Sequence, residues 1–168
     1  RRHARDRGAV RRWLTVQRAL ARIDERTLAK VLGAGVLDDG RPWVATELVD
    51  GQTLKARVKR SGPMHFNEAR PIVRGVLLAL EALHRKGLVH GDVKAENVFG
   101  VRPSASDKMR NEPTGVRVDA GDDRLFGTRS AKGGHTGIIP LFGTAKSLAP
   151  EQARTGAPQA ASDVYALG

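Results

Sequence analysis

Residues 88–99 constrain the fold of this chain more than any other stretch. Their sequence, Leu-Val-His-Gly-Asp-Val-Lys-Ala-Glu-Asn-Val-Phe, places a short polar loop between two apolar pairs. Lys94 follows Asp92 by two positions and Asn97 follows it by five, and Gly91 permits a tight turn just before the acid. Three converging polar side chains in such a short loop are hard to explain by packing alone. The stretch therefore predicts a catalytic or binding loop.

The composition excludes several classes of protein. The chain has 168 residues, of which 40% are apolar, and this is enough for the core of one domain or of part of one. It has no cysteine, so it forms neither disulfides nor thiolate metal sites. No run of about 18 apolar residues is present, so we expect no membrane segment in this chain. We expect a cytoplasmic protein, which leaves open an anchor elsewhere in a longer parent.

The charge is strongly positive, at +11, and this could indicate binding to nucleic acid. However, the basic residues are spread along the chain. The one dense run, residues 1–12, has no aromatic side chains between its arginines. We therefore expect solvated arginines on helix surfaces and no nucleic-acid partner.

Hydrophobic spacing predicts helices and strands before the polar loop. The expected elements are a helix over residues 9–23, a β-hairpin with strands at 28–36 and 43–49, a short helix over 54–60 and a long helix over 68–86. Thr53 and Asn67 are the predicted N-caps of the last two helices. Gly87, which follows two basic residues, is predicted to end the long helix.

The long helix is predicted to bury one apolar face. The residues expected on this face are Ile72, Val73, Val76, Leu77, Leu80 and Leu83. After the polar loop, residues 116–119 are predicted to form a strand that ends in an acid. A further helix is predicted to begin near residue 161, with Ser162 as its cap.

Several punctuated motifs stand in a fixed order. Residues 90–97 are His-Gly-Asp-Val-Lys-Ala-Glu-Asn, residues 119–121 are Asp-Ala-Gly, and residues 143–151 begin with Gly-Thr and end with Ala-Pro-Glu. Residues 162–168, Ser-Asp-Val-Tyr-Ala-Leu-Gly, and residues 47–54, Glu-Leu-Val-Asp-Gly-Gln-Thr-Leu, complete the set. In this order the motifs resemble those of the protein-kinase family, and in particular of bacterial-type Ser/Thr kinases.

The resemblance implies an α+β, protein-kinase-like fold with two partial lobes. Residues 1–8 would be a disordered basic N-terminus, and residues 9–49 a partial N-lobe with the regulatory helix and a β-hairpin that leads to the hinge. Residues 50–168 would form the first half of a mainly helical C-lobe, with the catalytic loop and activation segment. The family's Gly-rich phosphate loop, its lysine-bearing strand and its last helices are not found in the sequence. We therefore expect a kinase domain that is incomplete at both ends.

The resemblance also implies catalytic roles. Asp92 would orient the substrate hydroxyl and accept its proton, and Lys94 would neutralise charge on the transferred phosphoryl group. A lysine two residues after the acid is the Ser/Thr-kinase pattern. Asn97 and Asp119 would bind Mg²⁺, and Thr144 would hydrogen-bond Asp92 and Lys94. The implied cofactors are ATP and Mg²⁺, and the implied partner is a protein substrate with Ser or Thr.

Four further residues are implied in nucleotide binding. The backbone of Glu47 and Val49 would hydrogen-bond adenine, Phe99 would pack against the base, and Thr53 would lie near the ribose. Ordinary strand packing is the competing explanation for all four residues.

Three departures from the family pattern keep alternatives open. Val16 occupies the position of the glutamate that pairs with the phosphate-binding lysine, Gly91 replaces an arginine that senses activation-loop phosphorylation, and Ala120 replaces a phenylalanine. The second hypothesis is therefore a pseudokinase or interaction module. The third is a small-molecule phosphotransferase of the aminoglycoside type, in which His-Gly-Asp is usual. The chain by itself is expected to be inactive, since it has neither the Gly-rich loop nor the lysine.

Overall fold

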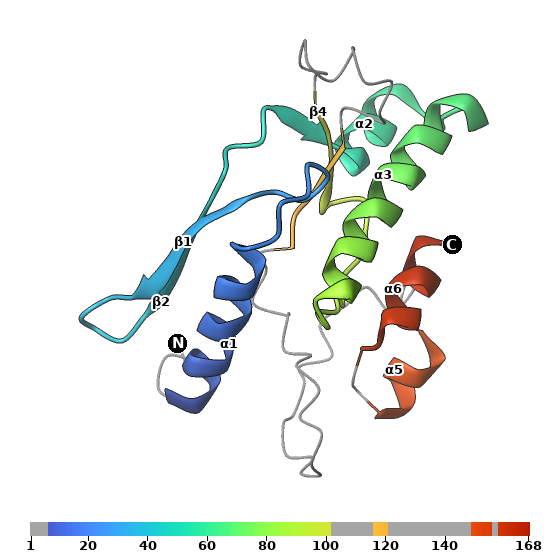
Figure 1. Ribbon diagram of the computed structural model, residues 1–168. Coiled ribbons are helices and arrows are strands. Elements are labelled where there is room, and N and C mark those ends of the chain that lie inside the picture. The colour runs from blue at the N-terminus through green and yellow to red at the C-terminus, as the bar shows by residue number, and fades with distance from the viewer. Residues whose placement is uncertain (1–6, 102–115, 121–148, 156–157) are drawn as a thin grey trace.

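The computed structural model describes residues 7–101, 116–120, 149–155 and 158–168 of the chain. The elements in chain order are α1 (Arg7–Leu20), β1 (Val31–Val36), β2 (Pro42–Thr46), β3 (Gly51–Thr53), α2 (Leu54–Ser61), α3 (Phe66–Arg85), β4 (Val98–Val101), β5 (Val116–Val118), α5 (Pro150–Thr155) and α6 (Ala160–Leu167). In Figure 1, α1 and the β1–β2 hairpin form one part, α2 and α3 lie against a second sheet, and α6 packs beside α3. Among the helices described, none is both long and apolar enough to cross a bilayer.

Helix α1 packs its buried face beside the antiparallel hairpin of β1 and β2. The buried side chains of α1 recur every three or four residues, at Trp13, Val16, Gln17 and Leu20. In the hairpin, Gly35 pairs with Trp43, and a Cβ at Gly35 would come within 2.8 Å of the indole Nε1. Glycine at this position therefore lets the indole lie across the neighbouring strand.

The second sheet joins segments that lie far apart in the sequence. Its strand order is β3-β4-β5, and both pairs are antiparallel. The polar loop at residues 88–97 leads directly into β4. The sheet therefore places that loop next to the segment before α2 and to the residue that follows β5.

Helix α3 covers β5, and their contact is close. A Cβ at Gly75 would lie only 2.8 Å from Cβ of Val116. One apolar cluster runs through both parts of the molecule, and its members include Val16, Leu28, Val76, Leu80, Leu83, Val98 and Val118. The two parts therefore share one core.

A short backbone ladder also joins the two parts. The N–H of Ala29 donates to the carbonyl of Val118 at 2.9 Å, and the N–H of Val118 donates to the carbonyl of Thr27 at 2.7 Å. The segment at residues 27–29 therefore pairs with β5, which explains why β1 begins at Val31 and not at residue 28 as predicted.

Other predicted boundaries also need correction. Helix α1 begins at Arg7, so residues 7 and 8, predicted to be disordered, are helical; arginine is a good helix former. Residues 1–6 lie outside the described residues. The second hairpin strand ends at Thr46 and not at residue 49. Two of the residues predicted on the buried face of α3, Val73 and Leu77, are 40% and 44% exposed, and Gly75, Ala79 and Ala82 are buried instead.

Two of the four predicted helix-end residues are confirmed. The hydroxyl of Thr53 accepts a hydrogen bond from the N–H of Ala56 at 3.1 Å, and Gly87 has the positive φ of 69° that suits the end of α3. Asn67 is not the N-cap of α3. The cap is His65, because the carboxylate of Glu68, three residues later, accepts a hydrogen bond from its N–H at 3.2 Å.

Ser162 is likewise not the cap of α6. It is the third helical residue, and the cap is Gln159. The Ser162 hydroxyl accepts a hydrogen bond from the N–H of Gln159 at 3.0 Å and donates to Glu151 at 2.6 Å. This bond to Ser162 lowers the pKa of Glu151. The serine thus joins α5 to α6 instead of ending a helix.

Candidate active site

The polar loop between α3 and β4 is held at both ends by apolar packing. Leu88, Val93 and Val98 are each about 5% exposed or less, and the N–H of Leu88 donates to the carbonyl of Leu83 at 3.1 Å. Apolar residues therefore fix the loop at the start, in the middle and at the end. The polar side chains between them are left to form the site.

A buried carboxylate from α6 holds the backbone of this loop. Asp163 is 1% exposed, and its two oxygens accept hydrogen bonds from the N–H groups of His90 at 2.8 Å and Gly91 at 2.7 Å. Asp163 thereby supports the backbone of the loop from α6. Gly91 has φ of 75°, so a side chain at this position would be strained.

The third contact of Asp163 was not predicted from the sequence. Nε2 of His84, in the last turn of α3, lies 2.7 Å from the same carboxylate oxygen that binds His90. His84 lies one helical turn after Leu80, and this spacing could have indicated that it lies on the buried side of α3. It connects α3, α6 and the loop.

His90 fills the space between the loop and β5 as a neutral side chain. It is 2% exposed, its Nε2 lies 3.0 Å from the carbonyl oxygen of Asp119, and its Nδ1 accepts from the N–H of Asp92 at 3.3 Å. These partners require the proton on Nε2. Burial lowers the pKa of His90, even though the nearby carboxylates of Asp163, Asp92 and Asp119 act in the opposite direction. His90 therefore helps to position Asp92 through its Nδ1.

Three predicted catalytic residues converge at one atom. Lys94 Nζ lies 2.6 Å from Oδ2 of Asp92, and Asn97 Nδ2 lies 3.2 Å from the same oxygen. Asn97 Nδ2 also donates to the carbonyl oxygen of Asp92 at 2.9 Å. The Asp92 side chain is only 8% exposed, so these bonds fix the orientation of a largely buried carboxylate.

The two predicted metal ligands are adjacent. Asp119 directly follows β5, and its N–H donates to the carbonyl oxygen of Asn97 at 2.9 Å. Because the amide nitrogen of Asn97 is used by Asp92, its amide oxygen is the atom turned to other partners. An amide oxygen and a carboxylate are ligands that Mg²⁺ prefers. In the described residues no group of three or more His, Asp or Glu could hold a metal. Thr144 lies outside the described residues.

The predicted nucleotide residues are partly brought together. Thr53 and Phe99 face each other as partners across β3 and β4. Glu47 and Val49 lie in the segment between β2 and β3. The N–H of Glu47 donates to the carbonyl of Lys30 at 2.8 Å, which leaves the Glu47 carbonyl as the backbone group that could bind a base.

Two ion pairs at the edge of the site were missed by sequence reasoning. Arg117 of β5 donates to the Glu47 carboxylate at 3.2 Å, and Lys55 of α2 lies 2.7 Å from Glu96 in the loop. The hydrogen bond from Lys55 lowers the pKa of Glu96. Both pairs join segments far apart in sequence, so no local pattern could have indicated them.

Comparison with known proteins decides which family this site belongs to. A family model described as a protein kinase domain matches residues 17–168. The chain belongs to the protein kinase family. This confirms the resemblance seen in the motifs, and members of the family generally use ATP and Mg²⁺.

Relatives and solved structures agree. The serine/threonine-protein kinase PknL of Mycobacterium tuberculosis is 37% identical over 168 residues, which cover 99% of this chain and 38% of PknL. The serine/threonine-protein kinase pkn3 of Myxococcus xanthus is 33% identical, over 97% of this chain and 29% of pkn3. The chain thus spans well under half the length of these kinases. A crystal structure of the M. tuberculosis PknI kinase domain matches with a TM-score of 0.68 and 25% identity, over 99% of this chain and 56% of the other. The α+β, protein-kinase-like fold is confirmed.

The departures from the kinase pattern lie in buried or constrained positions. Val16 is 2% exposed and belongs to the core cluster, and Ala120 is 4% exposed. Gln17, next to Val16, is fully buried, and within the described part of the chain neither of its amide atoms has a hydrogen-bond partner. Helix α1 therefore buries an apolar residue, and next to it an amide without a described partner, at the position where the resemblance implies a glutamate.

Proposed function

We propose that the protein carrying this domain is a Ser/Thr protein kinase that transfers the γ-phosphate of ATP to protein Ser or Thr hydroxyls. The observation that supports this best is the convergence of Lys94 and Asn97 on Oδ2 of Asp92. Phosphoryl transfer needs positioning and charge neutralisation more than covalent chemistry, and this arrangement supplies both. The lysine two residues after the acid favours a Ser/Thr hydroxyl as acceptor. Because the donor is ATP, the proposed reaction takes place in the cytoplasm.

In this proposal each residue of the loop has a defined task. Asp92, held at one carboxylate oxygen, aims the substrate hydroxyl and takes its proton, and Lys94 neutralises charge on the phosphoryl oxygens. Asn97 and Asp119 would hold Mg²⁺, which when bound neutralises charge on the phosphates. Thr144 is proposed to support Asp92 and Lys94.

The nucleotide would lie against β3, β4 and the segment before them. Phe99 would pack on the base, Thr53 would lie near the ribose, and the backbone of Glu47 and Val49 would bind the base edge. The pairing of Thr53 with Phe99 supports this placement. The 168 residues by themselves are expected to transfer phosphate poorly, because they contain neither a Gly-rich loop nor the lysine-bearing strand.

The test measures transfer of the γ-phosphate to a generic Ser/Thr protein substrate by the full-length gene product. Asp92→Asn should reduce the rate by about 100-fold or more, because it removes the proton acceptor and keeps the shape. The matched control is Asp24→Asn, at an exposed acid far from the loop in sequence. Equal incorporation by the wild type and Asp92→Asn would contradict the proposal.

A second function, a pseudokinase or interaction module, is favoured by the burial of Val16. An apolar residue at this position cannot pair with a phosphate-binding lysine. Thermal denaturation of the full-length product with and without Mg²⁺-ATP separates the two functions. Nucleotide-dependent stabilisation without measurable transfer would favour the second, whereas transfer that depends on Asp92 would favour the first.

A further inference from the structure

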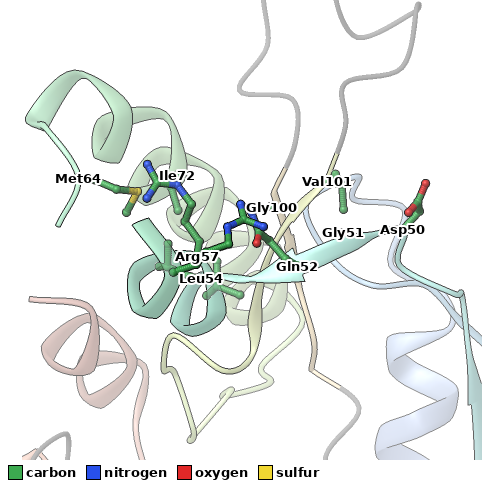
Figure 2. A pocket seen from close by; sticks show the side chains of 11 residues that line it. Asp50, Gly51, Gln52, Leu54, Arg57, Met64, Ile72, Gly100 and Val101 are labelled. Atoms are coloured by element: carbon green, nitrogen blue, oxygen red, sulfur yellow. The ribbon is translucent and has the colours of Figure 1, made fainter. Parts of the chain in front are cut away.

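The described part of the chain contains a pocket that lies between α2, the start of α3 and the β3–β4 strand pair. Its volume is about 560 Å³, within the range of small-molecule sites. Leu54, Ile72 and Val98 provide apolar surface, and Arg57 and Arg60 provide two guanidinium groups. Figure 2 shows Arg57 between Met64 and Ile72 on one side and Gln52 and Gly100 on the other.

This pocket is separate from the proposed nucleotide site. Val98 and Gly100 of β4 line it, whereas Phe99 between them does not, and Gln52 lines it whereas Thr53 does not. Gly51 and Val101 also line the pocket, at the end of the β3–β4 pair away from Thr53 and Phe99. None of the residues assigned to phosphoryl transfer lines it.

The two guanidinium groups of the pocket are only partly paired with acceptors among the described residues. Nη1 of Arg57 is buried and has no hydrogen-bond partner within the described residues, and Nη2 lies 3.6 Å from Oε1 of Glu68. Arg60, one turn further along α2, has no ion pair with any described residue. A buried guanidinium donor without an acceptor is costly, so the site favours an anion that can supply one.

The placement of Glu68 and Asp50 indicates which charge the bound anion should carry. At the α2 end of the pocket, Arg57 and Arg60 supply two positive charges, and Glu68, 3.6 Å from Arg57, is the acid paired with them among the described residues. Asp50 lies toward the opposite end, away from Met64 in Figure 2. The α2 end thus has one unmatched positive charge, which suits a singly charged head group better than a doubly charged one.

We propose that this pocket binds a small organic carboxylate with an apolar body. The carboxylate would accept hydrogen bonds from Arg57 and Arg60, since guanidinium and carboxylate groups match in geometry. The apolar body would lie on Leu54, Ile72 and Val98. This site does not depend on phosphoryl transfer and would be present whether or not the domain is catalytic.

Octanoate is the probe, titrated into the ¹⁵N-labelled 168-residue chain and followed by amide chemical shifts. Saturable shifts are expected at Leu54, Ile72 and Gly100, with little change at Asp92 and Asn97. Acetate, 1-octanol and octylamine should bind far more weakly, since each lacks the apolar body or the negative charge. Equal binding of 1-octanol or octylamine, shifts confined to the catalytic loop, or no saturable octanoate binding would overturn the proposal.

Substitutions of the two arginines test whether their charges bind the carboxylate. Arg57→Met, which keeps the apolar stem, should weaken octanoate binding by about tenfold. Arg60→Gln should weaken it by about threefold. Lys59→Gln is the matched control, because it removes one charge from α2 at a residue that does not line the pocket, and it should change affinity by less than about twofold.

Circular dichroism verifies that each variant is folded, and if Arg57→Met is unfolded, the variant at the exposed Arg60 decides the outcome. Unchanged affinity in a folded arginine variant would contradict the proposal.

Discussion

Polar side chains are buried both around the polar loop at residues 88–97 and in helix α1, but their hydrogen bonding differs between the two regions. In the loop region, the buried Asp163 is bonded to His84, His90 and Gly91. In α1, the amide of Gln17 is fully buried and has no partner among the described residues. A satisfied buried network fixes one geometry, whereas an unsatisfied buried group costs about 1–3 kcal/mol. The loop is therefore organised for a defined arrangement of atoms, whereas the buried face of α1 relies mainly on apolar packing.

The largest expected effect comes from removing the carboxylate at the centre of the loop network. Asp163→Ala leaves the N–H groups of His90 and Gly91 and Nε2 of His84 without their acceptor, so it should lower the free energy of unfolding by about 3–5 kcal/mol. Urea unfolding followed by circular dichroism measures this loss. Asp24→Ala, at an exposed acid, is the control and should change little. Similar losses in both variants would show that the network does not stabilise the loop.

A change in α1 should act in the opposite direction. Gln17→Leu replaces the unpaired amide by an apolar group of similar volume, so it should raise the free energy of unfolding by about 1–2 kcal/mol. Thermal or urea denaturation provides the measurement. Arg18→Leu, at the exposed neighbour on the same helix, is the control and should stay within about 0.5 kcal/mol of the wild type. A loss of stability in Gln17→Leu would mean that the amide has a partner.

The smallest effect concerns His90 and pH. Burial lowers the folded-state pKa of His90 below its ordinary value of 6.5, so the unfolded chain takes up a proton first as the pH falls. The contribution of His90 is therefore fully present above pH 6.5 and is lost as the pH falls toward the lowered pKa.

Urea unfolding at about pH 8 and about pH 5 measures this dependence. It should be steeper in the wild type than in His90→Gln, by at most about 1.4 kcal/mol per pH unit. Equal slopes in the two proteins would show that His90 titrates alike in the folded and unfolded chain.

The catalytic loop was largely predictable because its determinants are local. The spacing of Asp92, Lys94 and Asn97 is short enough for one loop to bring them together, and the structure does so. Gly87 ends its helix as expected because glycine adopts the positive φ of 69° at this position without strain. The roles of these residues in phosphoryl transfer stay predictions, and so does that of Thr144.

The remaining features could not be predicted because they depend on distant or competing partners. Asn67 has a favourable cap residue type, yet the reach of Glu68 back to His65 sets the start of α3 two residues earlier. The Glu47–Arg117 and Lys55–Glu96 contacts join residues separated by 70 and 41 positions, and only the sheet brings them together.

The pairing of residues 27–29 with β5 has a mechanical consequence for the site. Val118 is hydrogen-bonded on both sides of its peptide to the segment that follows α1, and the next residue is Asp119. Any displacement of α1 and its hairpin would therefore pull on the carboxylate proposed to bind the metal. The slow or fast hydrogen exchange of the Ala29 and Val118 amides would report whether this link between the two parts stays closed in solution.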